Sequence, residues 1–555
     1  MQNHFGKLTL GAIMMLLITS FSPNEANAQD FIENATVQGN IYSEANYYFT
    51  DTLIGADKVP EYIRANIYGN IFYRYKGFNA GLRYEAYQPP LLGYDSRYEG
   101  NGIAHLFINY TDSLFEVTIG NFYEQYGSGI VLRAYEDKNL GIDNAFDGFR
   151  LLIRPANGLT IKGMIGKQRY YWENGPGTVR GLDAEWSVLQ LLNPESSTNL
   201  TLGASAVSRF QSDRDPIYNL PENVAAFAGR ASLYAGNFFA SAEYGWKVND
   251  PSATNGLIYK NGQALVLNTS YSAKGLGILL SGKYIDNMDF RSSRNASGND
   301  LTLSYLPATT KQHTYGLPGM YPYATQPNGE VGAMAQVNYQ IPRNSKLGGK
   351  YGTHIQLTAS IANSIAKEKV NDTINIGTPG TKGYVAKFGK IGDEKYYHDL
   401  GLEINKRLTR ELRLVAGAAN QFYNKAIIEG HPGEESVKAW IVYADASYRL
   451  ANSQNIRAEV QHLQTKEDKG NWAMMLVEYS IAPKWSFSIS DQFNYGHDDK
   501  TLRKHYYSIN TTYNQGPHRL ALNFGKQREG IICVGGICRK VPAAFAAGIT
   551  FSTTF

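Results

Sequence analysis

Apolar and polar residues alternate with a period of two along most of this chain. In the final stretch, VPAAFAAGITFSTTF, Phe545, Ile549 and Phe551 share one face, and small or polar residues occupy the other. Successive side chains of a β-strand point to opposite faces, so this period predicts strands whose two faces meet different surroundings. The same alternation recurs at 65–74, 82–86, 456–461 and 520–525.

Two architectures use such strands: a soluble sandwich or propeller with a dry core, and a membrane barrel with a lipid-facing outside and a wet lumen. The links between strands favour the barrel, because short polar turns alternate with longer links, the longest near 289–328 and 366–394. A membrane barrel has short turns at its periplasmic end and long loops outside, whereas a sandwich has no reason to alternate them. The short turns lie at 76–79, 155–158, 235–237, 272–275, 407–411, 450–455 and 514–517.

The strand pattern gives one strand near 36–50, a series of hairpins and a last strand over 541–555, about 24 strands to within two. An even number places both termini in the periplasm and lets the first strand close on the last, so we expect 37–48 to pair antiparallel with 543–555. The sequence therefore predicts an all-β fold, a transmembrane antiparallel up-and-down β-barrel with short periplasmic turns and long extracellular loops. The hairpins are expected at 63–88, 102–124, 147–170, 178–210, 223–249, 261–289, 329–365, 395–424, 436–466, 470–496 and 503–528.

The chain begins with a pattern typical of a signal peptide. Lys7 precedes an apolar run over 8–21, and Ala26, Asn27 and Ala28 form an A-x-A cleavage site. We expect a signal peptide over 1–28, with an uncleaved helical anchor as the alternative, and a single barrel domain over 29–555. The few residues before the first strand would leave no room for a plug domain. No later apolar run approaches the roughly 18 residues that a membrane-spanning helix needs.

The composition fits an exported barrel. The chain has 40 Tyr and 24 Phe, and its formal net charge of +4 gives no case for nucleic acid as a partner. Tyrosine suits the lipid–water boundary, where its ring meets hydrocarbon and its hydroxyl meets water. Candidates for such a belt, all near predicted strand ends, are Tyr47, Tyr48, Tyr87, Tyr170, Tyr171, Tyr271 and Tyr284.

Charged residues on the polar faces of the predicted strands require a wet lumen. An Arg or Lys facing hydrocarbon at mid-depth would cost roughly 2 to 4 kcal/mol. Their signs are mixed, which argues against a strongly anion-selective or cation-selective pore. The predicted lumen-facing charges are Arg74, Arg83, Glu85, Arg230, Glu403, Arg413, Asp445, Arg449, Arg457 and Glu459.

Three links are long enough to occupy a wide lumen: 125–146, 290–328 and 366–394. The first lacks the Lys-Ser/Thr of a phosphate loop; its acidic residues could bind Ca²⁺ or form ion pairs within a loop that folds inward. The second is rich in Pro and Tyr, and we expect it to fold inward as well, whereas the lysine-rich third stays outside. Charged residues crowd into and just after the first link, and we expect Arg133, Glu136 and Asp137 to meet the charged wall; the whole set is Arg133, Glu136, Asp137, Lys138, Asp143 and Asp147.

Cys533 and Cys538, separated by Val-Gly-Gly-Ile, are the only cysteines of the chain. In an exported protein the simplest reading is a disulfide that stiffens a tight loop, with a redox-active pair or a thiolate metal site as the alternatives.

Two blocks resemble an outer-membrane β-barrel family of Bacteroidota whose function is unknown. They are EQYGSGIVLRAYEDKNLGIDNAFDGFR, over 124–150, and GIICVGGICRKVPAAFAAGITFSTTF, over 530–555. The resemblance implies a location in the cell outer membrane and carries over no catalytic or ligand residue.

These observations leave two functions open. One is a porin-like passive channel whose loops narrow a wide polar lumen. The other is a non-transporting structural, secretion or assembly accessory barrel, which would act with outer-membrane protein or lipoprotein partners besides the lipid. An enzyme is not expected, because no histidine has a nucleophile motif such as G-x-S-x-G beside it, and no cofactor is implied.

Overall fold

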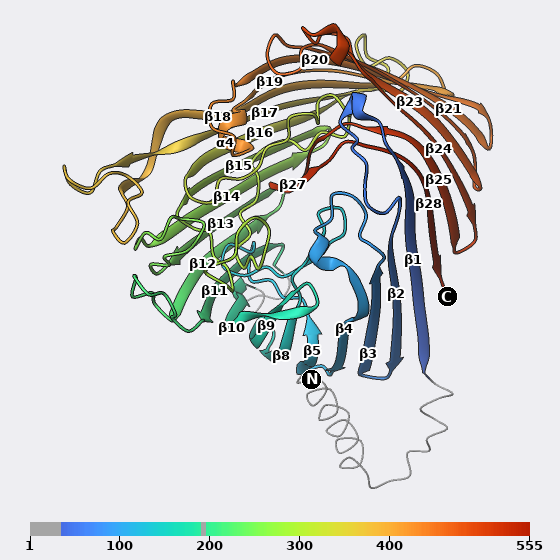
Figure 1. Ribbon diagram of the computed structural model, residues 1–555. Helices are drawn as coiled ribbons and strands as arrows, with labels where there is room; N and C mark the ends of the chain where they lie inside the picture. The colour runs from blue at the N-terminus through green and yellow to red at the C-terminus, as the bar shows by residue number, and fades with distance from the viewer. Residues whose placement is uncertain (1–34, 190–195) are drawn as a thin grey trace.

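The structure is a computed structural model that describes residues 35–189 and 196–555. Within these residues one antiparallel sheet of 24 strands closes on itself to form a barrel (Figure 1). The strand number and the up-and-down order confirm the prediction. The predicted signal peptide, 1–28, lies outside the described residues.

The first half of the wall consists of β1 (Thr36–Phe49), β2 (Ile63–Tyr75), β3 (Phe78–Tyr87), β4 (Gly100–Thr111), β5 (Phe115–Phe122), β8 (Phe146–Ala156), β9 (Leu159–Tyr170), β10 (Glu173–Ser187), β11 (Thr198–Phe210), β12 (Asn223–Ala235), β13 (Phe238–Lys247) and β14 (Gly262–Ala273). The second half consists of β15 (Leu276–Asp286), β16 (Glu330–Ile341), β17 (Thr353–Glu368), β18 (Val385–Arg407), β19 (Leu412–Tyr423), β20 (Val437–Ala451), β21 (Gln454–Gln464), β22 (Trp472–Ile481), β23 (Trp485–Asn494), β24 (His505–Gln515), β25 (His518–Gln527) and β28 (Ala544–Thr554).

The barrel closes where β1 pairs with β28. Their antiparallel register runs from Asn40 opposite Thr554 to Phe49 opposite Phe545, and the Gly39 amide donates to the Phe555 carbonyl at 2.9 Å. The predicted pairing of the first and last strands is therefore confirmed. Closure leaves no strand edge whose backbone groups would lack partners in lipid, where each unpaired group costs several kcal/mol.

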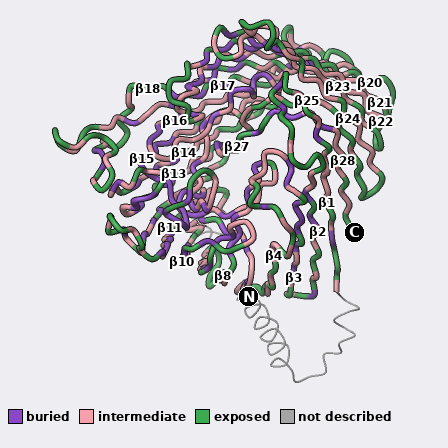
Figure 2. Tube along the Cα trace, viewed as in Figure 1, coloured by how far each residue is buried: buried purple, intermediate pink, exposed green. Residues whose placement is uncertain are grey.

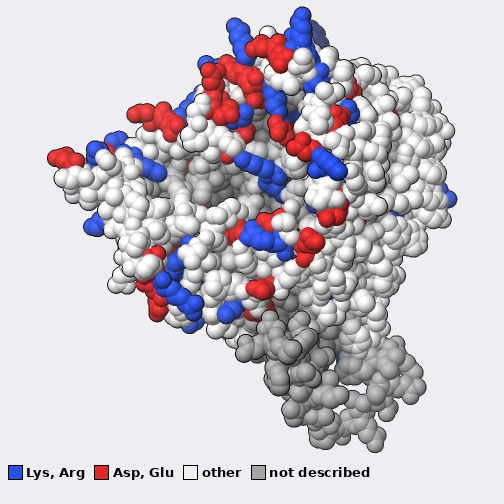
Figure 3. Space-filling model, viewed as in Figure 1, with Lys and Arg blue, Asp and Glu red and all other residues white. Residues whose placement is uncertain are grey.

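The outer face of the wall is apolar and exposed. On β25, Leu520, Leu522 and Phe524 are exposed, while Ala521 and Asn523 point into the barrel. Large exposed apolar side chains at every second position match a lipid-facing surface. Figure 3 shows one flank of the barrel almost free of charged side chains, whereas acidic and basic side chains gather at the end that carries the loops and around a hollow.

The predicted tyrosine belt is correct only in part. Tyr47 and Tyr271 point outward and are exposed. Tyr48 and Tyr87 have the inward parity of their strands and are buried, and the Tyr48 hydroxyl accepts a hydrogen bond from the Leu92 amide at 3.2 Å. Their assignment to the belt is wrong, because a link that folds over the inner wall covers them there.

The remaining belt candidates divide in the same way. Tyr284 has the outward parity but is covered by Phe388, with ring centroids 4.6 Å apart. Tyr170 and Tyr171 lie at the end of β9, where both hydroxyls reach Asp300 of another link.

Links of two lengths alternate around most of the barrel. We call the end that carries the longer links the loop end and the opposite end the turn end. Among the departures, Tyr171 and Trp172 alone join β9 to β10 at the loop end, whereas 342–352 form a long link at the turn end. The predicted link 366–394 is strand at both of its ends: β17 and β18 extend past the wall as a hairpin that projects from the barrel in Figure 1, drawn in yellow to orange.

The described parts of the links include the short helices η1 (Thr52–Ile54), η2 (Ser96–Tyr98), η3 (Lys500–Leu502) and α4 (Lys425–Ile428). No helix in the described parts of the chain is both long and apolar enough to cross a membrane. Two small hairpins also lie in the links: β6 (Glu136–Asp137) with β7 (Ile142–Asp143), and β26 (Gly530–Val534) with β27 (Ile537–Val541). These links, rather than the wall, distinguish one side of the lumen from the other.

Candidate functional site: the loop-packed lumen

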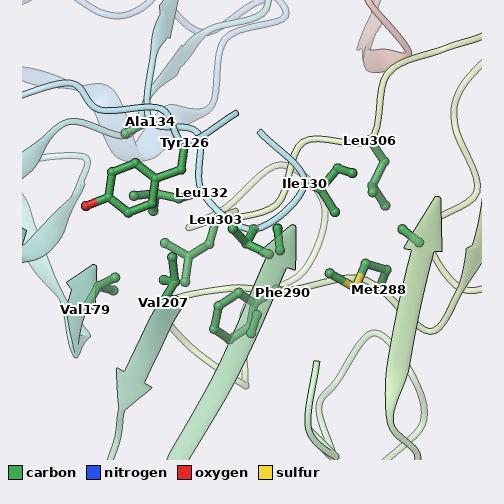
Figure 4. Close-up of a cluster of buried hydrophobic side chains, with 14 of the residues drawn as sticks. Tyr126, Ile130, Leu132, Ala134, Val179, Val207, Met288, Phe290, Leu303 and Leu306 are labelled. Carbon is green, nitrogen blue, oxygen red and sulfur yellow. The ribbon is translucent and has the colours of Figure 1, made fainter. Parts of the chain in front are cut away.

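Two links enter the barrel from the loop end and pack against its inner wall. We call 123–145 the first inner segment and 287–329 the long inner segment. Ile130 and Leu132 of the first, and Phe290 and Leu303 of the second, are fully buried in one apolar cluster. Figure 4 shows this cluster against Val179 and Val207 of the wall strands. The wall contributes inward-facing Val179, Val207, Val224, Ala226, Ala264, Val266 and Ile285, which we call the covered wall.

The close fit between segment and wall depends on small residues. A Cβ atom added at Gly177 of β10 would lie 1.8 Å from the Ser292 carbonyl oxygen of the long inner segment. Such a distance is far inside van der Waals contact, so any side chain at this position would force the long inner segment off the wall. The covered wall is therefore shaped to hold the segment.

The long inner segment continues across the lumen to a second apolar cluster. Leu317, Tyr321 and Tyr323 are buried there against Tyr397 and Trp472 of the wall. Other members of this cluster from the wall are Tyr423, Ile441 and Leu463. The segment thus contacts two stretches of wall, β10–β15 and β18–β22, which are separated by β16 and β17.

Hydrogen bonds fix the second anchor. The Leu317 amide donates to Gln461 Oε1 at 2.8 Å, and Gln421 Nε2 donates to the Pro318 carbonyl at 2.9 Å. His313 also contacts the Asp399 carboxylate. Backbone groups of a strand-free segment need such partners when they are buried, so the inward wall amides replace the ladder that the segment lacks.

A buried ion-pair network joins the first inner segment to the wall. Arg83 contacts Glu85 and Glu136, each at 2.8 Å, and also contacts Asp143. Arg169 contacts Glu85 at 2.7 Å and Asp143 at 2.5 Å. Buried charges are tolerated when they are paired and hydrogen-bonded. This network therefore attaches the first inner segment to the wall through ion pairs, in addition to the contacts of the apolar cluster.

The other charged residues of the first inner segment have separate surroundings. Arg133 lies over the Tyr305 ring, 3.9 Å from its centroid, and Asp137 accepts a hydrogen bond from the Leu140 amide at 3.1 Å. Asp147 is already part of β8, where it is exposed and accepts from Asn174 at 3.0 Å. Of the three residues expected to meet the charged wall, Glu136 does so, at Arg83.

The arrangement does not favour Ca²⁺. Oxygen atoms of Glu85, Glu136 and Asp143 lie within 4.8 Å of one another, but Arg83 and Arg169 already occupy the space between the carboxylates and neutralise them. Asp147, which the sequence alternative would have needed as a ligand, points away on β8. We read the cluster as the attachment of the first inner segment.

Strand register places all ten predicted lumen charges on the inner face. Arg230 contacts Asp183 at 2.8 Å and Glu185 at 3.1 Å, and Arg457 contacts Asp445 at 2.6 Å as well as Glu459. Glu403 accepts from the Tyr443 hydroxyl at 2.9 Å; Arg74 and Arg413 donate to Asn79 and Asn405, and Arg449 is exposed near the turn end. Arg83, Arg230 and Arg457 are thus neutralised by neighbouring carboxylates.

The opposite part of the wall is polar and uncovered. Ser488, Asn510 and Asn523 stand side by side on β23, β24 and β25, and none is buried. We call this surface the bare wall; it comprises Ser486, Ser488, Ser490, Ser508, Asn510, Thr512, Asn523, Thr550 and Ser552. Figure 2 shows buried residues concentrated near β10–β13 and mostly intermediate or exposed residues along β22–β25. The sequence analysis did not single out this surface.

The disulfide lies in a hairpin that touches the long inner segment. Cys533 and Cys538 form a disulfide across β26 and β27. The Ala308 and Thr325 amides donate to the carbonyls of Gly535 and Gly536, at 3.2 and 3.0 Å. The tip of the hairpin thus contacts the middle of the long inner segment.

A closed antiparallel barrel with an apolar, exposed outside and a polar inside is a transmembrane β-barrel. The chain belongs to DUF6029, a family of unknown function, whose family model matches residues 5–555. No curated protein matches the sequence.

Solved structures with a similar fold include several pores and receptors. The siderophore receptor PirA from Pseudomonas aeruginosa is 8% identical, with a TM-score of 0.39, 94% of this chain covered and 80% of that chain. The usher PapC translocation pore is 10% identical, with a TM-score of 0.39 and 94% and 99% covered. OpdQ from Pseudomonas aeruginosa is 8% identical, with a TM-score of 0.33 and 94% and 97% covered. Likeness this distant leaves the function to the geometry of the lumen.

Proposed function

We propose that the protein is an outer-membrane channel for small hydrophilic solutes, narrowed by its own inner segments. The bare wall carries this proposal. Its hydroxyl and amide side chains remain open on the inside of the barrel while the covered wall opposite is packed against the inner segments. A strip of neutral polar groups offers hydrogen-bonding partners to a solute and binds it weakly enough for the solute to leave again.

The charges in the lumen support a channel of weak ionic selectivity. Arg230 and Arg457 are each paired with two carboxylates, so neither sign dominates the inner wall. In the proposed orientation the loop end faces the outside of the cell and both termini face the periplasm, as in other barrels of this kind.

Single cysteines test the proposal directly, because the only two cysteines of the chain form a disulfide. We expect Ser488→Cys and Asn510→Cys to lose conductance in planar bilayers when a negatively charged methanethiosulfonate is added. Ile489→Cys and Ile509→Cys are matched controls, since these neighbouring side chains face outward and are exposed. Conducting barrels in which modification of Ser488→Cys and Asn510→Cys changes nothing would contradict a path along the bare wall.

One observation favours the second function, a non-transporting accessory barrel. The long inner segment is anchored to the wall in two apolar clusters, and the β17–β18 hairpin projects beyond the wall with Val385, Phe388 and Ile391 exposed. An exposed apolar strand pair beyond the wall suits a protein or lipoprotein partner. Silent bilayers, together with a partner recovered in stoichiometric amount through that hairpin, would favour this function over the channel.

A further inference from the structure

Five stretches of chain enclose a cavity of about 460 Å³ at the loop end. They are 93–98, 140–144, 169–171, 297–301 and 538–540. The volume lies within the range of small-molecule sites. None of its lining residues belongs to the bare wall, so the pocket is distinct from the proposed channel path. We call it the loop-end pocket.

Tyrosine rings form much of the lining. Tyr98 and Tyr171 lie edge to face with centroids 4.6 Å apart, and Tyr170 packs on Tyr171 at 5.0 Å. The Tyr98 hydroxyl donates to the Gly141 carbonyl at 3.0 Å, and Tyr94 donates to the Lys138 carbonyl. The hydroxyls of Tyr94 and Tyr98 are thus committed to the backbone, which fixes both rings and leaves their apolar surfaces as wall.

The carboxylates of the lining are already paired. Arg97 contacts Asp95 at 2.6 Å and Asp300 at 2.9 Å, and Asp143 is held by Arg169. The hydrogen bond from Arg97 lowers the pKa of Asp95 to about 2. These acidic groups therefore serve the loop structure and leave no negative charge unmatched in the pocket.

Two cations follow each other in the hairpin, and neither has a carboxylate partner in the described part of the chain. Arg539 faces the pocket: it donates from Nη1 to the Gly93 carbonyl at 2.8 Å and lies over the Tyr94 ring, while its Nε is buried without a hydrogen-bond partner. Lys540 points to the opposite face of β27, where its Nζ lies 2.9 Å from the His431 ring nitrogen. A buried donor without a partner costs free energy, so an anionic group that meets Arg539 would be stabilised.

Both cations owe their positions to the disulfide hairpin. They follow Cys538 on β27, and the Cys538 carbonyl accepts from Asn299 Nδ2 of the long inner segment at 2.9 Å. The hairpin therefore places positive charge opposite the tyrosines, next to Asn299 and Ser297 of the same lining.

We propose that the loop-end pocket binds an acidic saccharide. The C–H face of a pyranose ring packs on tyrosine rings such as Tyr170, the hydroxyls exchange hydrogen bonds with polar side chains such as Asn299, and the carboxylate or sulfate meets Arg539. A neutral sugar lacks the ionic contact, and a simple anion lacks the stacking. The pocket is thus a capture site at the loop end, distinct from the channel path.

Calorimetry on the detergent-solubilised full barrel tests this inference. The probes are glucuronic acid, glucose 6-sulfate, glucose and acetate. We expect saturable binding of at least one of the two acidic sugars, with glucose and acetate at least tenfold weaker. The preferred acidic sugar reports whether the charged group is a carboxylate or a sulfate. Acetate that binds as tightly as the acidic sugars would overturn the saccharide assignment, and no saturable binding by any probe would overturn the site.

Variants locate the binding. Arg539→Gln should weaken binding of the acidic sugar at least tenfold, whereas Lys540→Gln, on the opposite face of β27, and Arg503→Gln, an exposed arginine beside η3, should leave it unchanged. Tyr170→Ala should weaken binding of the acidic sugar, whereas Tyr170→Phe should keep the wild-type affinity because the ring is retained. Equal affinity in all variants would place the ligand elsewhere. The measurement needs no conductance, so failure of the channel proposal and failure of this one are distinguishable.

Discussion

The covered wall and the bare wall belong to one sheet with one register, yet their inner faces differ in chemistry. Val224 and Ala226 of the covered wall are fully buried beneath the inner segments, whereas Ser488 and Asn510 of the bare wall remain open. The outward residues of both walls are apolar and exposed. The comparison shows that the inward positions of a wide barrel reveal where its loops dock: aliphatic residues there indicate a docked segment, and hydroxyls or amides indicate water.

The charges follow the same division. On the covered side, buried Arg83 and Arg169 are paired with carboxylates of both the wall and the first inner segment. The residues of the bare wall are neutral, and charges on the same face lie only beside them, at Arg519 opposite Ser552 and at Glu478 opposite Ser488. Charge burial costs several kcal/mol per ion unless the ions are paired, so charged groups gather where the segment supplies partners.

The largest expected effect is on conductance. Replacing 309–322, which includes the second anchor at Leu317 and Pro318, with a short Gly-Ser linker should raise single-channel conductance severalfold, because this part of the long inner segment no longer occupies the lumen. The matched control replaces 371–374, an exposed turn of the β17–β18 hairpin, with Asn-Gly and should leave conductance unchanged. Equal conductance of the 309–322 variant and the wild type would show that the long inner segment does not limit the pore.

A substitution in the packed core should lower the free energy of unfolding much more than a substitution on the bare wall. Phe290→Ala removes a fully buried ring from the covered side and should lower the free energy of unfolding by about 3 to 5 kcal/mol. Ser488→Ala on the bare wall should change it by less than about 0.5 kcal/mol. Urea unfolding of the folded barrel, followed by its shifted migration on gels, measures both. Similar losses for the two variants would mean that the covered wall is not the packed one.

The disulfide should have a smaller effect. Cys533→Ser with Cys538→Ser opens a short ring, which chain-entropy scaling values at roughly 2 kcal/mol. We expect the barrel to assemble, the hairpin to become sensitive to protease near 530–541, and the affinity of the loop-end pocket for its acidic sugar to fall. Thiol titration of the denatured wild type, with and without reductant, checks the bond itself. Equal titres would contradict it.

The smallest effect concerns pH at the loop end. The pKa of Asp95 is lowered to about 2 by Arg97, so its contribution to loop stability is present above its ordinary pKa, near 4, and is lost as the pH falls through about 2. Trp172, whose Nε1 donates to the Tyr98 carbonyl at 2.7 Å, reports on this region by fluorescence. The stability of the loop end, followed by this fluorescence, should differ between wild type and Asp95→Asn from pH 7 to pH 4 and become equal below about pH 2. A constant difference throughout would assign the stabilisation to another group.

Much of the wall could be predicted because its signal is local. The two-residue period at 456–461 or 520–525 depends only on which face meets lipid, and each strand repeats it independently. The strand number, the closure of β1 on β28 and the pairing of Cys533 with Cys538 followed from that period, from chain parity and from the small number of cysteines. The belt assignment of Tyr48 and Tyr87 failed because parity, rather than position near a strand end, decides which side a ring faces.

The packing of the links inside the barrel could be predicted from the sequence only in part. The covered wall does have a sequence signal that predicts it: 224–228 reads Val-Ala-Ala-Phe-Ala and 264–267 reads Ala-Leu-Val-Leu, apolar on both faces. Two apolar faces in a lipid-facing strand predict that something covers the inside. The bare wall has the opposite signal in Ser-Phe-Ser-Ile-Ser over 486–490.

The sequence by itself determined the barrel, because lipid outside and water inside act on every strand in the same way. Only the tertiary structure decided which carboxylate meets Arg83, where Pro318 and Leu317 anchor, and how Arg539 comes to face Tyr94 across more than 400 residues of chain. Such contacts depend on how links from distant hairpins share one lumen. Their partners are set by the closure of the whole sheet, a long-range geometry that no local period records.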